Sequence, residues 1–359
     1  MSVALTAETA PARSLRDTNS HDISARDLGG PRQPMLIAES LTKHFTLSGA
    51  GKRALVRAVD AISFDVRKGE TLGIVGESGC GKSTTARLLI GLIKPDCGTL
   101  VFDGEEVGSA RGISVRKLQR SVQMVFQDSY TSLNPRLTLQ DTIAFGPRIS
   151  GHSRREAKRR ADAVLRLVGL DPERYSARYP HELSGGQRQR VNVARALAME
   201  PRLLILDEAV SALDKSIEAQ VLNLLQELKA RLALTFIFIS HDLSVVRFVS
   251  DRVLVMYLGK VLEIGPVDRI YDDPRHPYTK ALLASRPSMD PKRRRNTPPL
   301  TGDPPSPIDP PSGCRFRTRC ALAEAVCAAR EPQLAEQSDG HFAACLAVTP
   351  GSGHSAAAA

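Results

Sequence analysis

Residues 71–83 read Thr-Leu-Gly-Ile-Val-Gly-Glu-Ser-Gly-Cys-Gly-Lys-Ser, and this stretch decides the fold. Its first five residues, Thr71–Val75, form an apolar run of strand length, and Ser83–Leu92 has the apolar spacing of a helix that packs on a sheet. Between them, Gly76–Ser83 matches the pattern G-x-x-x-x-G-K-[ST]. A strand, a glycine-rich loop and a helix in this order predict a site that cradles phosphate groups.

Each position of this loop has a physical task. The glycines let backbone N–H groups wrap a phosphate, and the positive end of the following helix adds to the attraction. We expect Lys82 to reach the β- and γ-phosphates of a nucleotide and the Ser83 hydroxyl to help hold Mg²⁺. Cys80 is interpreted as a small side chain tolerated where only the backbone contacts phosphate, with a reactive thiol as the alternative. The predicted nucleotide contacts in this region are Gly76, Glu77, Ser78, Gly79, Cys80, Gly81, Lys82, Ser83 and Thr84.

Strands and helices alternate on both sides of the loop. Two short strands are expected before it, at Met35–Ala38 and Ala61–Val66. Residues 153–169 form an amphipathic helical pattern with Gly169 as its stop. This alternation predicts a mainly parallel sheet covered on both faces. The later elements are strands at Ser121–Phe126, Leu203–Leu206 and Thr235–Ser240, and helices at Ser216–Leu232 and Leu243–Val249.

The composition is that of a globular protein, and 359 residues are enough for one large domain with an appendage or for two ordinary domains. No apolar run among the 359 residues approaches the roughly 20 residues of a membrane-spanning helix. No secretory signal is recognised, so we expect the protein in the cytosol. The net charge of +10 permits binding to nucleic acid or to an anionic membrane. Because the basic residues gather at Arg154–Arg160 and Lys292–Arg295, solvated faces are the favoured interpretation and a juxtamembrane contact is the alternative.

Two further motifs carry chemistry. The apolar strand Leu203–Leu206 is followed by Asp207 and Glu208, and two carboxylates at the end of a buried strand are costly unless a metal or a partner uses them. We expect Asp207 to reach Mg²⁺ through water and Glu208 to polarise an attacking water. Upstream, Leu183–Gln187 places a serine and two glycines at a predicted helix start, which makes a second anion-binding helix N-terminus.

Together these motifs resemble the nucleotide-binding subunit of an ABC transporter. They stand in family order and cover the family's whole ATPase domain, from about residue 35 to 270. The resemblance makes Gly76–Ser83 the P-loop, Leu183–Gln187 the signature motif and 203–208 the Walker B strand. Ala209 departs from the family, which usually has proline there, but it removes no catalytic group. The resemblance also implies a Q-loop glutamine at Gln127, a D-loop at Ser211–Asp214, a switch histidine at His241 and an adenine-stacking ring at Phe45.

In that family two ATPase domains meet head to tail, and the signature motif of one closes over ATP held by the other. The chain carries one set of motifs, so the resemblance implies a partner chain. The implied catalytic residues are Glu208, His241, Lys82 and Gln127, and the implied Mg²⁺ ligands are Ser83, Gln127 and Asp207. The implied nucleotide contacts outside the P-loop are Phe45, Gln127, Ser184, Gly185, Gly186, Gln187, Asp207 and Asp214.

Three segments resemble the peptide/nickel importer subfamily. They are Phe126–Pro135, Ala209–Asp214 together with Gln220–Leu225, and Pro274–Leu283. The second resembles the "F"-type ATPase subunit, which usually pairs with a "D"-type sister. The resemblance implies ATP-driven import of oligopeptides or dipeptides at the cytoplasmic face of the membrane. The implied partners are the sister ATPase, two membrane permease subunits and an extracytoplasmic peptide-binding protein, with no nucleic acid.

Two alternatives stay open at this point. One keeps the importer and changes the cargo to nickel or another small solute. The other is of a different class, a soluble nucleic-acid-associated ABC ATPase, which the net charge of +10 permits.

Four cysteines crowd into the end of the chain. Their spacing is C-x5-C-x6-C-x17-C, and in a cytosolic, loop-rich segment four thiols favour a metal or cluster site over disulfides. The segment resembles the C-terminal extension of the same subfamily, which implies a [4Fe–4S] cluster. Zinc, which also accepts four thiolates, and unliganded cysteines are the alternatives. The four residues are Cys314, Cys320, Cys327 and Cys345.

The predicted fold class is α/β: a P-loop ABC ATPase domain with a mainly parallel sheet, an antiparallel β subdomain and an inserted helical subdomain, followed by a small cysteine-containing C-terminal extension. The predicted organisation is a mobile extension at 1–34, an ATPase domain at 35–275 with its helical subdomain at about 133–200, a linker and C-terminal domain at 276–348, and a disordered tail at 349–359. Nine prolines within residues 287–312 mark the linker.

Overall fold

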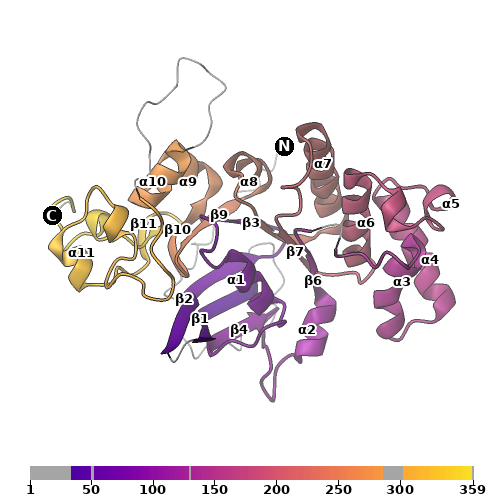
Figure 1. Cartoon of the computed structure of the whole chain (residues 1–359), viewed down its shortest axis with the longest axis horizontal. Helices are drawn as coiled ribbons and strands as arrows, with labels where there is room; N and C mark the ends of the chain where they lie inside the picture. Colours follow the sequence, from indigo (N-terminus) through magenta and orange to yellow (C-terminus); the bar gives the residue numbers. More distant parts are fainter. Residues whose placement is uncertain (1–33, 50–51, 129–130, 286–301, 358–359) are drawn as a thin grey trace, which may run out of the picture.

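A sheet of eight strands runs through the centre of the molecule (Figure 1). The five strands from β9 to β6 pair in parallel, and β9, β10, β12 and β11 continue the sheet as an antiparallel edge. The prediction of a mainly parallel α/β sheet is therefore confirmed. In spatial order the strands are β11 (Ala335–Ser338), β12 (His341–Ala343), β10 (Lys260–Pro266), β9 (Arg252–Tyr257), β3 (Thr71–Val75), β8 (Thr235–Ile239), β7 (Leu203–Asp207) and β6 (Val122–Val125).

The computed structural model describes residues 34–49, 52–128, 131–285 and 302–357. The expectations for an extension at residues 1–33, for the basic run Lys292–Arg295 and for the linker up to residue 301 lie outside these ranges. Two positions of the segment Phe126–Pro135, residues 129 and 130, lie outside them too.

A second, antiparallel sheet of four strands lies below the central sheet in Figure 1. Its order is β2 (Lys52–Arg67), β1 (Pro34–Gly49), β4 (Cys97–Phe102) and β5 (Glu105–Glu106). The two short strands expected from the sequence are parts of two 16-residue strands, β1 and β2. The register between them shifts after Pro34, Ala38, Leu41 and Lys43. Such bulges interrupt the alternation of apolar and polar residues, which is why the pattern reveals only short pieces of each strand.

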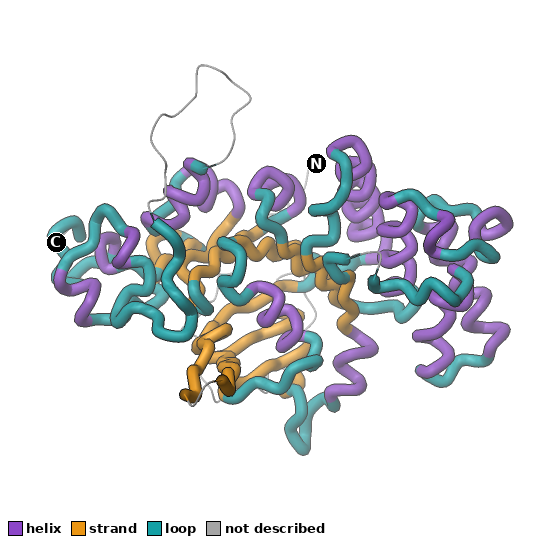
Figure 2. Tube along the Cα trace, in the orientation of Figure 1, coloured by secondary structure: helices purple, strands orange, loops and turns teal. Residues whose placement is uncertain are grey.

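The central sheet is buried on both faces because successive side chains of a strand point to opposite sides. In β7, Leu204 and Leu206 join a core formed with the helices above the sheet, whereas Leu203 and Ile205 join a core formed with α1 and the antiparallel sheet below it (Figure 2). Fully buried strands are expected to be apolar throughout, as β3, β7 and β8 are except at Asp207 and at the threonines that begin β3 and β8. The helices around the sheet are α1 (Lys82–Leu89), α2 (Val115–Ser121), α7 (Lys215–Leu232), α8 (Leu243–Val249), α9 (Val267–Asp272) and α10 (Pro277–Ala284).

A helical lobe is inserted between β6 and β7 and forms one end of the molecule (Figure 1). The amphipathic pattern at 153–169 predicts its longest helix, α4, and is confirmed: Ser153 caps the helix by accepting the N–H of Glu156, and Gly169 follows its end with a φ of 75°. The helices of this lobe are α3 (Leu139–Ile149), α4 (Arg154–Leu167), α5 (Pro172–Tyr175) and α6 (Gly185–Leu197), with a 3₁₀ turn at Pro180–Glu182.

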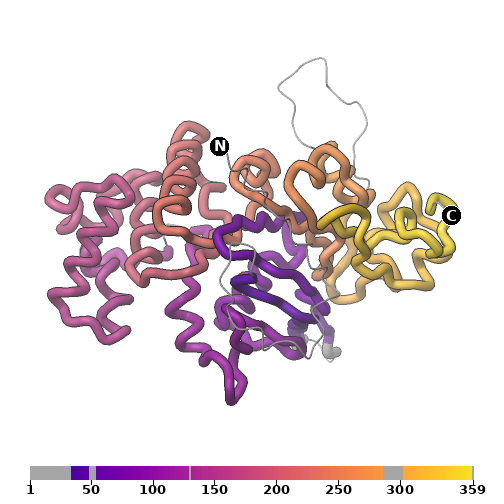
Figure 3. The backbone as a smooth tube through the Cα atoms, turned by 180° about the vertical axis from the view of Figure 1, so that it is seen from behind, coloured from indigo at the N-terminus to yellow at the C-terminus, as the bar shows by residue number. Residues whose placement is uncertain are grey.

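The C-terminal lobe, residues 302–357, lies at the opposite end of the molecule (Figure 3). It contains β11, β12, the short helix α11 (Ala325–Ala329) and 3₁₀ turns at Arg317–Arg319 and Leu346–Val348. The lobe continues the central sheet, because β12 pairs with β10 through Ile264 and Phe342. The cysteine segment is therefore part of the same sheet and core as the P-loop and its neighbouring strands, not a separate body.

Part of the predicted tail is ordered against this lobe. Ser352 and His354 are buried, and the His354 Nε2 atom lies 2.8 Å from the carbonyl oxygen of Leu322. The Ser352 hydroxyl donates to the carbonyl of Leu346 at 2.6 Å. The prediction of a disordered tail is thus corrected for residues 349–357, whose Gly-, Ser- and Ala-rich composition hides these long-range partners.

A buried carboxylate ties the lobe to the rest of the chain. Glu263 on β10 is fully buried and accepts the backbone N–H groups of Arg275 at 2.6 Å and His276 at 3.0 Å. The Nε2 atom of the equally buried His341 lies 2.7 Å from the same carboxylate. Such a network fixes β10, β12 and the start of α10 together, since leaving any of its members unpaired is costly.

Candidate functional site

The glycine-rich loop leaves the carboxyl end of β3 and leads into α1. A Cβ atom on Gly81, whose φ is 110°, would lie 2.2 Å from the carbonyl oxygen of Ala58, and one on Gly76 would lie 2.2 Å from that of Met256. Only glycine fits at these two close approaches. The Lys82 Nζ atom bridges the loop by donating to the carbonyls of Gly76 at 2.7 Å and Glu77 at 3.0 Å, so the loop is already curled around this ammonium group.

The predicted Mg²⁺ ligands Ser83 and Asp207 lie together at the end of β7. The Ser83 hydroxyl donates to the Asp207 carboxylate at 3.2 Å. Asp207 is 5% exposed, and this burial raises the pKa of its carboxyl group. A hydroxyl and a carboxylate are hard oxygen ligands of the kind that Mg²⁺ prefers, and the cation would compensate the buried charge. The residues present therefore fit this ion.

Three predicted catalytic side chains meet at Glu208, the residue that follows Asp207. The Gln127 amide donates to the Glu208 carboxylate at 3.0 Å, and the His241 Nδ1 atom lies 3.3 Å from the same oxygen. These residues follow β6, β7 and β8, which are neighbours in the sheet. Glu208 itself has a left-handed φ of 48°, which turns its side chain out of the strand. A carboxylate held between an amide and an imidazole at the carboxyl edge of a parallel sheet can orient and polarise a water molecule.

The signature segment lies elsewhere in the fold. Ser184 and Gln187 form a reciprocal capping box at the start of α6, in the helical lobe, whereas the P-loop leads into α1 below the central sheet (Figure 1). A Cβ atom on Gly186 would lie 2.4 Å from the Ile217 side chain, so this glycine allows α6 to pack on α7. Gly185 follows the cap, and Asp214 is exposed at the start of α7.

The remaining predicted contacts fall into exposed and buried groups. Ser78 and Gly79 are exposed at the tip of the P-loop, and the Phe45 ring on β1 is 37% exposed, while Thr84 lies in the first turn of α1. Cys80 is buried, and burial raises the pKa of its thiol. A buried, protonated thiol agrees with the interpretation of Cys80 as a small tolerated side chain.

Two residues that touch the P-loop have no signal in the local sequence pattern. The Tyr278 hydroxyl accepts the backbone N–H of Glu77 at 3.0 Å. The Arg319 guanidinium donates to the Glu77 carboxylate at 2.8 and 3.1 Å. Both partners belong to segments that the sequence analysis assigned to the subfamily, but neither segment was expected near the nucleotide.

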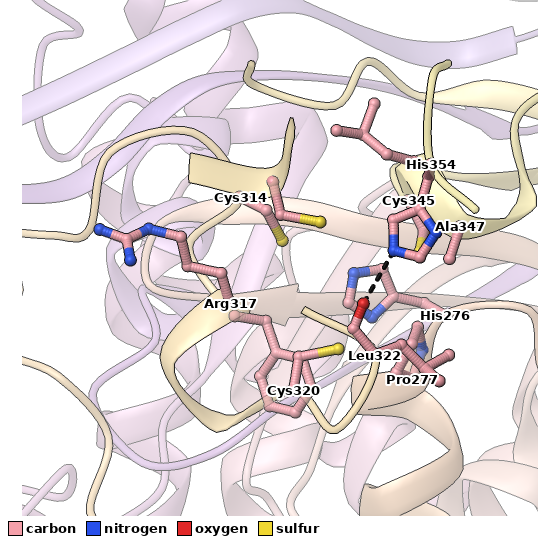
Figure 4. A pocket seen from close by; sticks show the side chains of 12 residues that line it. His276, Pro277, Cys314, Arg317, Cys320, Leu322, Cys345, Ala347 and His354 are labelled. Carbon is pink, nitrogen blue, oxygen red and sulfur yellow. Dashed lines mark hydrogen bonds between the residues drawn. The ribbon is translucent and has the colours of Figure 1, made fainter. Parts of the chain in front are cut away.

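The four C-terminal cysteines line one apolar space (Figure 4). In Figure 4 the sulfur atoms of Cys314 and Cys320 point into this space, and Cys327 and Cys345 complete its lining. Burial raises the pKa of Cys314 to about 12 and that of Cys345 to about 11. In the part of the chain that the structure describes, no three His, Cys, Asp or Glu residues are placed to share a single metal ion.

Comparison with known proteins agrees with this geometry. The family described as "ABC transporter" matches residues 59–211, and the one described as "Oligopeptide/dipeptide transporter, C-terminal region" matches residues 262–327. A probable peptide ABC transporter ATP-binding protein of Sinorhizobium fredii is 49% identical over 320 residues, which are 88% of this chain and 90% of the relative. The chain belongs to the ABC transporter family. It is thus an ATPase of the ABC class.

Other relatives and solved structures of ABC proteins lead to the same family. The oligopeptide transport ATP-binding protein AppF of Bacillus subtilis is 48% identical over 324 residues, covering 88% of this chain and 97% of the relative. The structure of cbiO1 from Clostridium perfringens, part of the ABC transporter complex cbiONQ, matches with a TM-score of 0.57 and 29% identity over 67% of this chain and 91% of that one. A dimeric post-hydrolysis ATP-binding cassette with ADP and Pi bound matches with a TM-score of 0.56 and 28% identity, covering 65% and 99% of the two chains.

Proposed function

We propose that the chain hydrolyses ATP to drive an ABC importer of oligopeptides or dipeptides. The observation that carries the hydrolytic part is the convergence of Gln127 and His241 on Glu208, beside the Ser83–Asp207 pair. The peptide cargo is supported by relatives named as peptide and oligopeptide transport proteins, whose similarity extends over 88% of this chain.

The residues at the carboxyl edge of the sheet have different roles in ATP hydrolysis. Lys82 and the backbone N–H groups of the P-loop bind the phosphates. The hydrogen bonds that the Lys82 ammonium group now donates to two loop carbonyls are replaced by bonds to the γ-phosphate. Ser83 and Asp207, with Gln127 as a third implied ligand, would hold Mg²⁺, which would supply positive charge to the phosphates when bound. Glu208 polarises the water, and His241 supports it from the end of β8. Phe45 stacks on the adenine from β1.

Assembly with other chains completes the site. The Ser184–Gln187 segment begins a helix in the helical lobe, where it is presented for ATP held by a partner ATPase of the "D" type. Two permease subunits contact the Gln127 region, so that closure on ATP opens the transport path, and a peptide-binding protein delivers cargo. Within the described ranges no helix is both long and apolar enough to cross a membrane. In this proposal the permeases span the membrane, and the chain binds to them at its cytoplasmic face.

We further propose that the four cysteines hold a [4Fe–4S] cluster. The support is the shared lining of one apolar space by four thiols, together with a buried donor that faces the same space. His276 is 1% exposed; its Nδ1 accepts the N–H of Tyr278, which leaves the proton on Nε2, and Nε2 has no hydrogen-bond partner among the described residues. N–H groups directed at sulfur are what such clusters use to tune their redox potential.

The sequence spacing of the cysteines, C-x5-C-x6-C-x17-C, lacks the C-x2-C pairs usual in structural zinc sites, which favours the cluster over zinc. A four-iron cluster takes one thiolate on each iron, so its ligands stand farther apart than the four around a single zinc ion, where each Zn–S bond is about 2.3 Å. When bound, the cluster supplies a redox-active cross-link between the segments that bear the cysteines.

Metal analysis after anaerobic purification tests the cluster. We expect about four irons and four acid-labile sulfides per chain, as four cysteine ligands imply, and their loss in the Cys327→Ser variant. The matched control is Cys97→Ser, because Cys97 is an exposed cysteine on β4 outside the lobe. One zinc ion per chain, or protein without iron and sulfide, would contradict the proposal.

Co-purification from detergent-solubilised membranes tests the transport function. We expect the tagged chain to bring down multi-span permeases and a second ATPase, identified by mass spectrometry. A peptide that binds to the associated binding protein supports the cargo, whereas nickel binding to it would contradict the peptide assignment. Recovery of nucleic-acid-associated proteins and no permease would contradict the transport function while leaving the ATPase intact.

A further inference from the structure

The C-terminal lobe reaches into the nucleotide site through one arginine. Arg319 ends the 3₁₀ turn Arg317–Arg319 and makes a bidentate pair with Glu77, the second residue of the P-loop. Its side chain is only 6% exposed and that of Glu77 22%. The same guanidinium donates to the Tyr257 hydroxyl at 3.3 Å. A bidentate pair with this little solvent access is among the stronger side-chain interactions in proteins.

An aromatic cluster holds the lobe in place for this contact. Phe316, three residues before Arg319, packs edge-on against Tyr257 and Tyr278, with ring centroids 5.5 and 5.3 Å away. Tyr278 in turn accepts the Glu77 N–H through its hydroxyl. Arg315 on the same segment is hydrogen-bonded to the carbonyl of Leu258 and to the Asp60 carboxylate. The arginine is therefore positioned by packed rings and a second ion pair rather than by a free surface loop.

We propose that Arg319 is a positioning residue for nucleotide binding, which acts through Glu77 and sets the affinity of the P-loop for Mg-ATP. The inference rests on the proposed nucleotide site, and it deepens that site by giving the C-terminal lobe a part in it. Glu77 places a carboxylate in a loop whose task is to bind an anion. Arg319 cancels that charge, so that the field at the loop stays attractive for the triphosphate.

Removal of the arginine leaves the Glu77 charge without its partner. Arg319→Gln is therefore expected to weaken Mg-ATP binding about five- to tenfold, as charge-assisted bonds of this kind do when one partner is truncated. Arg319→Lys keeps the charge without the two-pronged geometry and is expected to retain part of the affinity. Because the cause is electrostatic, the loss shrinks as ionic strength rises.

Calorimetric titration of the full-length chain with Mg-ATP tests this, at low and at high salt. The matched control is Arg317→Gln, which removes an arginine from the same 3₁₀ turn. The Arg317 guanidinium donates to the Ser312 carbonyl and points away from the cysteines in Figure 4. The affinity of this variant for Mg-ATP is expected to match the wild type within about twofold, the spread usual for surface changes. Unfolding temperatures without nucleotide confirm that each variant is folded.

The decisive variant is Glu77→Gln in the Arg319→Gln background. If Arg319 acts by cancelling the charge of Glu77, the double variant regains affinity to within about twofold of wild type, a non-additivity expected for groups in contact. Glu77→Gln alone keeps the backbone N–H of the P-loop and leaves the Arg319 charge uncompensated, so it is expected to bind Mg-ATP at least as tightly as the wild type, and it keeps the test open if Arg319→Gln does not fold. A folded Arg319→Gln variant with wild-type affinity, or a loss that Glu77→Gln does not relieve, overturns the inference. Wild-type protein that binds no Mg-ATP would instead contradict the nucleotide site itself.

Discussion

The nucleotide site and the cysteine cavity both gather reactive side chains, but by different means. At the nucleotide site, Gln127, Glu208 and His241 follow adjacent parallel strands, so the sheet alone brings them into contact. At the cavity, the cysteines come from turns and short helices of the C-terminal lobe. A site built on strands is assembled before its ligand arrives, whereas a thiol site in irregular chain is completed by its metal.

The difference shows in the polar groups of the two places. The carboxylates at the nucleotide site already have hydrogen-bond partners, as in the Ser83–Asp207 pair. The cavity instead holds thiols with raised pKa values and the Nε2 atom of His276, which has no hydrogen-bond partner among the described residues. We infer that changes at the nucleotide site act on chemistry, and that changes in the lobe act on stability and on the P-loop beside it.

The largest effect is expected from Glu208→Gln. The amide keeps the shape of the side chain but cannot polarise water as a carboxylate does, so phosphate release should fall by about 10²- to 10³-fold. Mg-ATP binding and the unfolding temperature should stay near wild type. The control Glu200→Gln, at an exposed carboxylate paired with Arg160, should hydrolyse ATP normally. Equal loss in both variants would contradict the assignment of the water-polarising carboxylate to Glu208.

Gly81→Ala tests whether the P-loop is preassembled. The new Cβ would lie 2.2 Å from the Ala58 carbonyl at a φ of 110°. Strain of about 1–3 kcal/mol at such a position predicts roughly 5- to 150-fold weaker Mg-ATP binding. Gly108→Ala is the control, since its φ of 82° is also left-handed but nothing lies within 4 Å. Fluorescent-nucleotide titration should find nucleotide binding by the control unchanged. Weaker binding by both variants would mean that a general loss of stability, rather than the close approach at Gly81, causes the effect.

Glu263→Ala tests the attachment of the lobe. It leaves His341 and two backbone N–H groups buried without their acceptor, which should lower the free energy of unfolding by about 3 kcal/mol or more. Thermal unfolding measures the change, and hydrogen exchange should rise first in residues 335–343. Glu336→Ala on the neighbouring strand, where the carboxylate is exposed, should change stability by less than about 0.5 kcal/mol. Equal stability of the two variants would contradict the view that Glu263 ties the lobe to the sheet.

Asp60→Asn should have the smallest effect. Asp60 lies on β2 and pairs with Arg315 of the C-terminal lobe. Burial opposes ionisation of Asp60, but Lys260 and Arg315 outweigh it and lower its pKa below 3.8. Since the pKa is depressed in the folded state, the stabilisation is complete above pH 3.8 and is lost as the pH falls through the folded value. Urea unfolding should show a cost of about 1 kcal/mol that is the same at pH 7.5 and 4.5. A cost that disappears between these two pH values would contradict this sign.

The sequence predicts local elements well and long-range contacts poorly. Strand β3 and helix α8 have the predicted bounds because each depends on its own run of apolar residues. The antiparallel edge β11–β12 and the packing of His354 escape prediction because their partners are distant and their own patterns are weak. The same holds at the nucleotide site, where motifs reveal Ser83 and Asp207, but the pair of Glu77 and Arg319 joins residues 242 positions apart.

We infer that hydrolysis at Glu208 drives peptide import. The most direct measurement is uptake of labelled oligopeptides into vesicles reconstituted with this chain, its partner ATPase and the two permeases, with the binding protein and ATP supplied. We expect ATP-dependent accumulation with the wild-type chain and none with Glu208→Gln at equal assembly. Accumulation that persists undiminished with Glu208→Gln would contradict it.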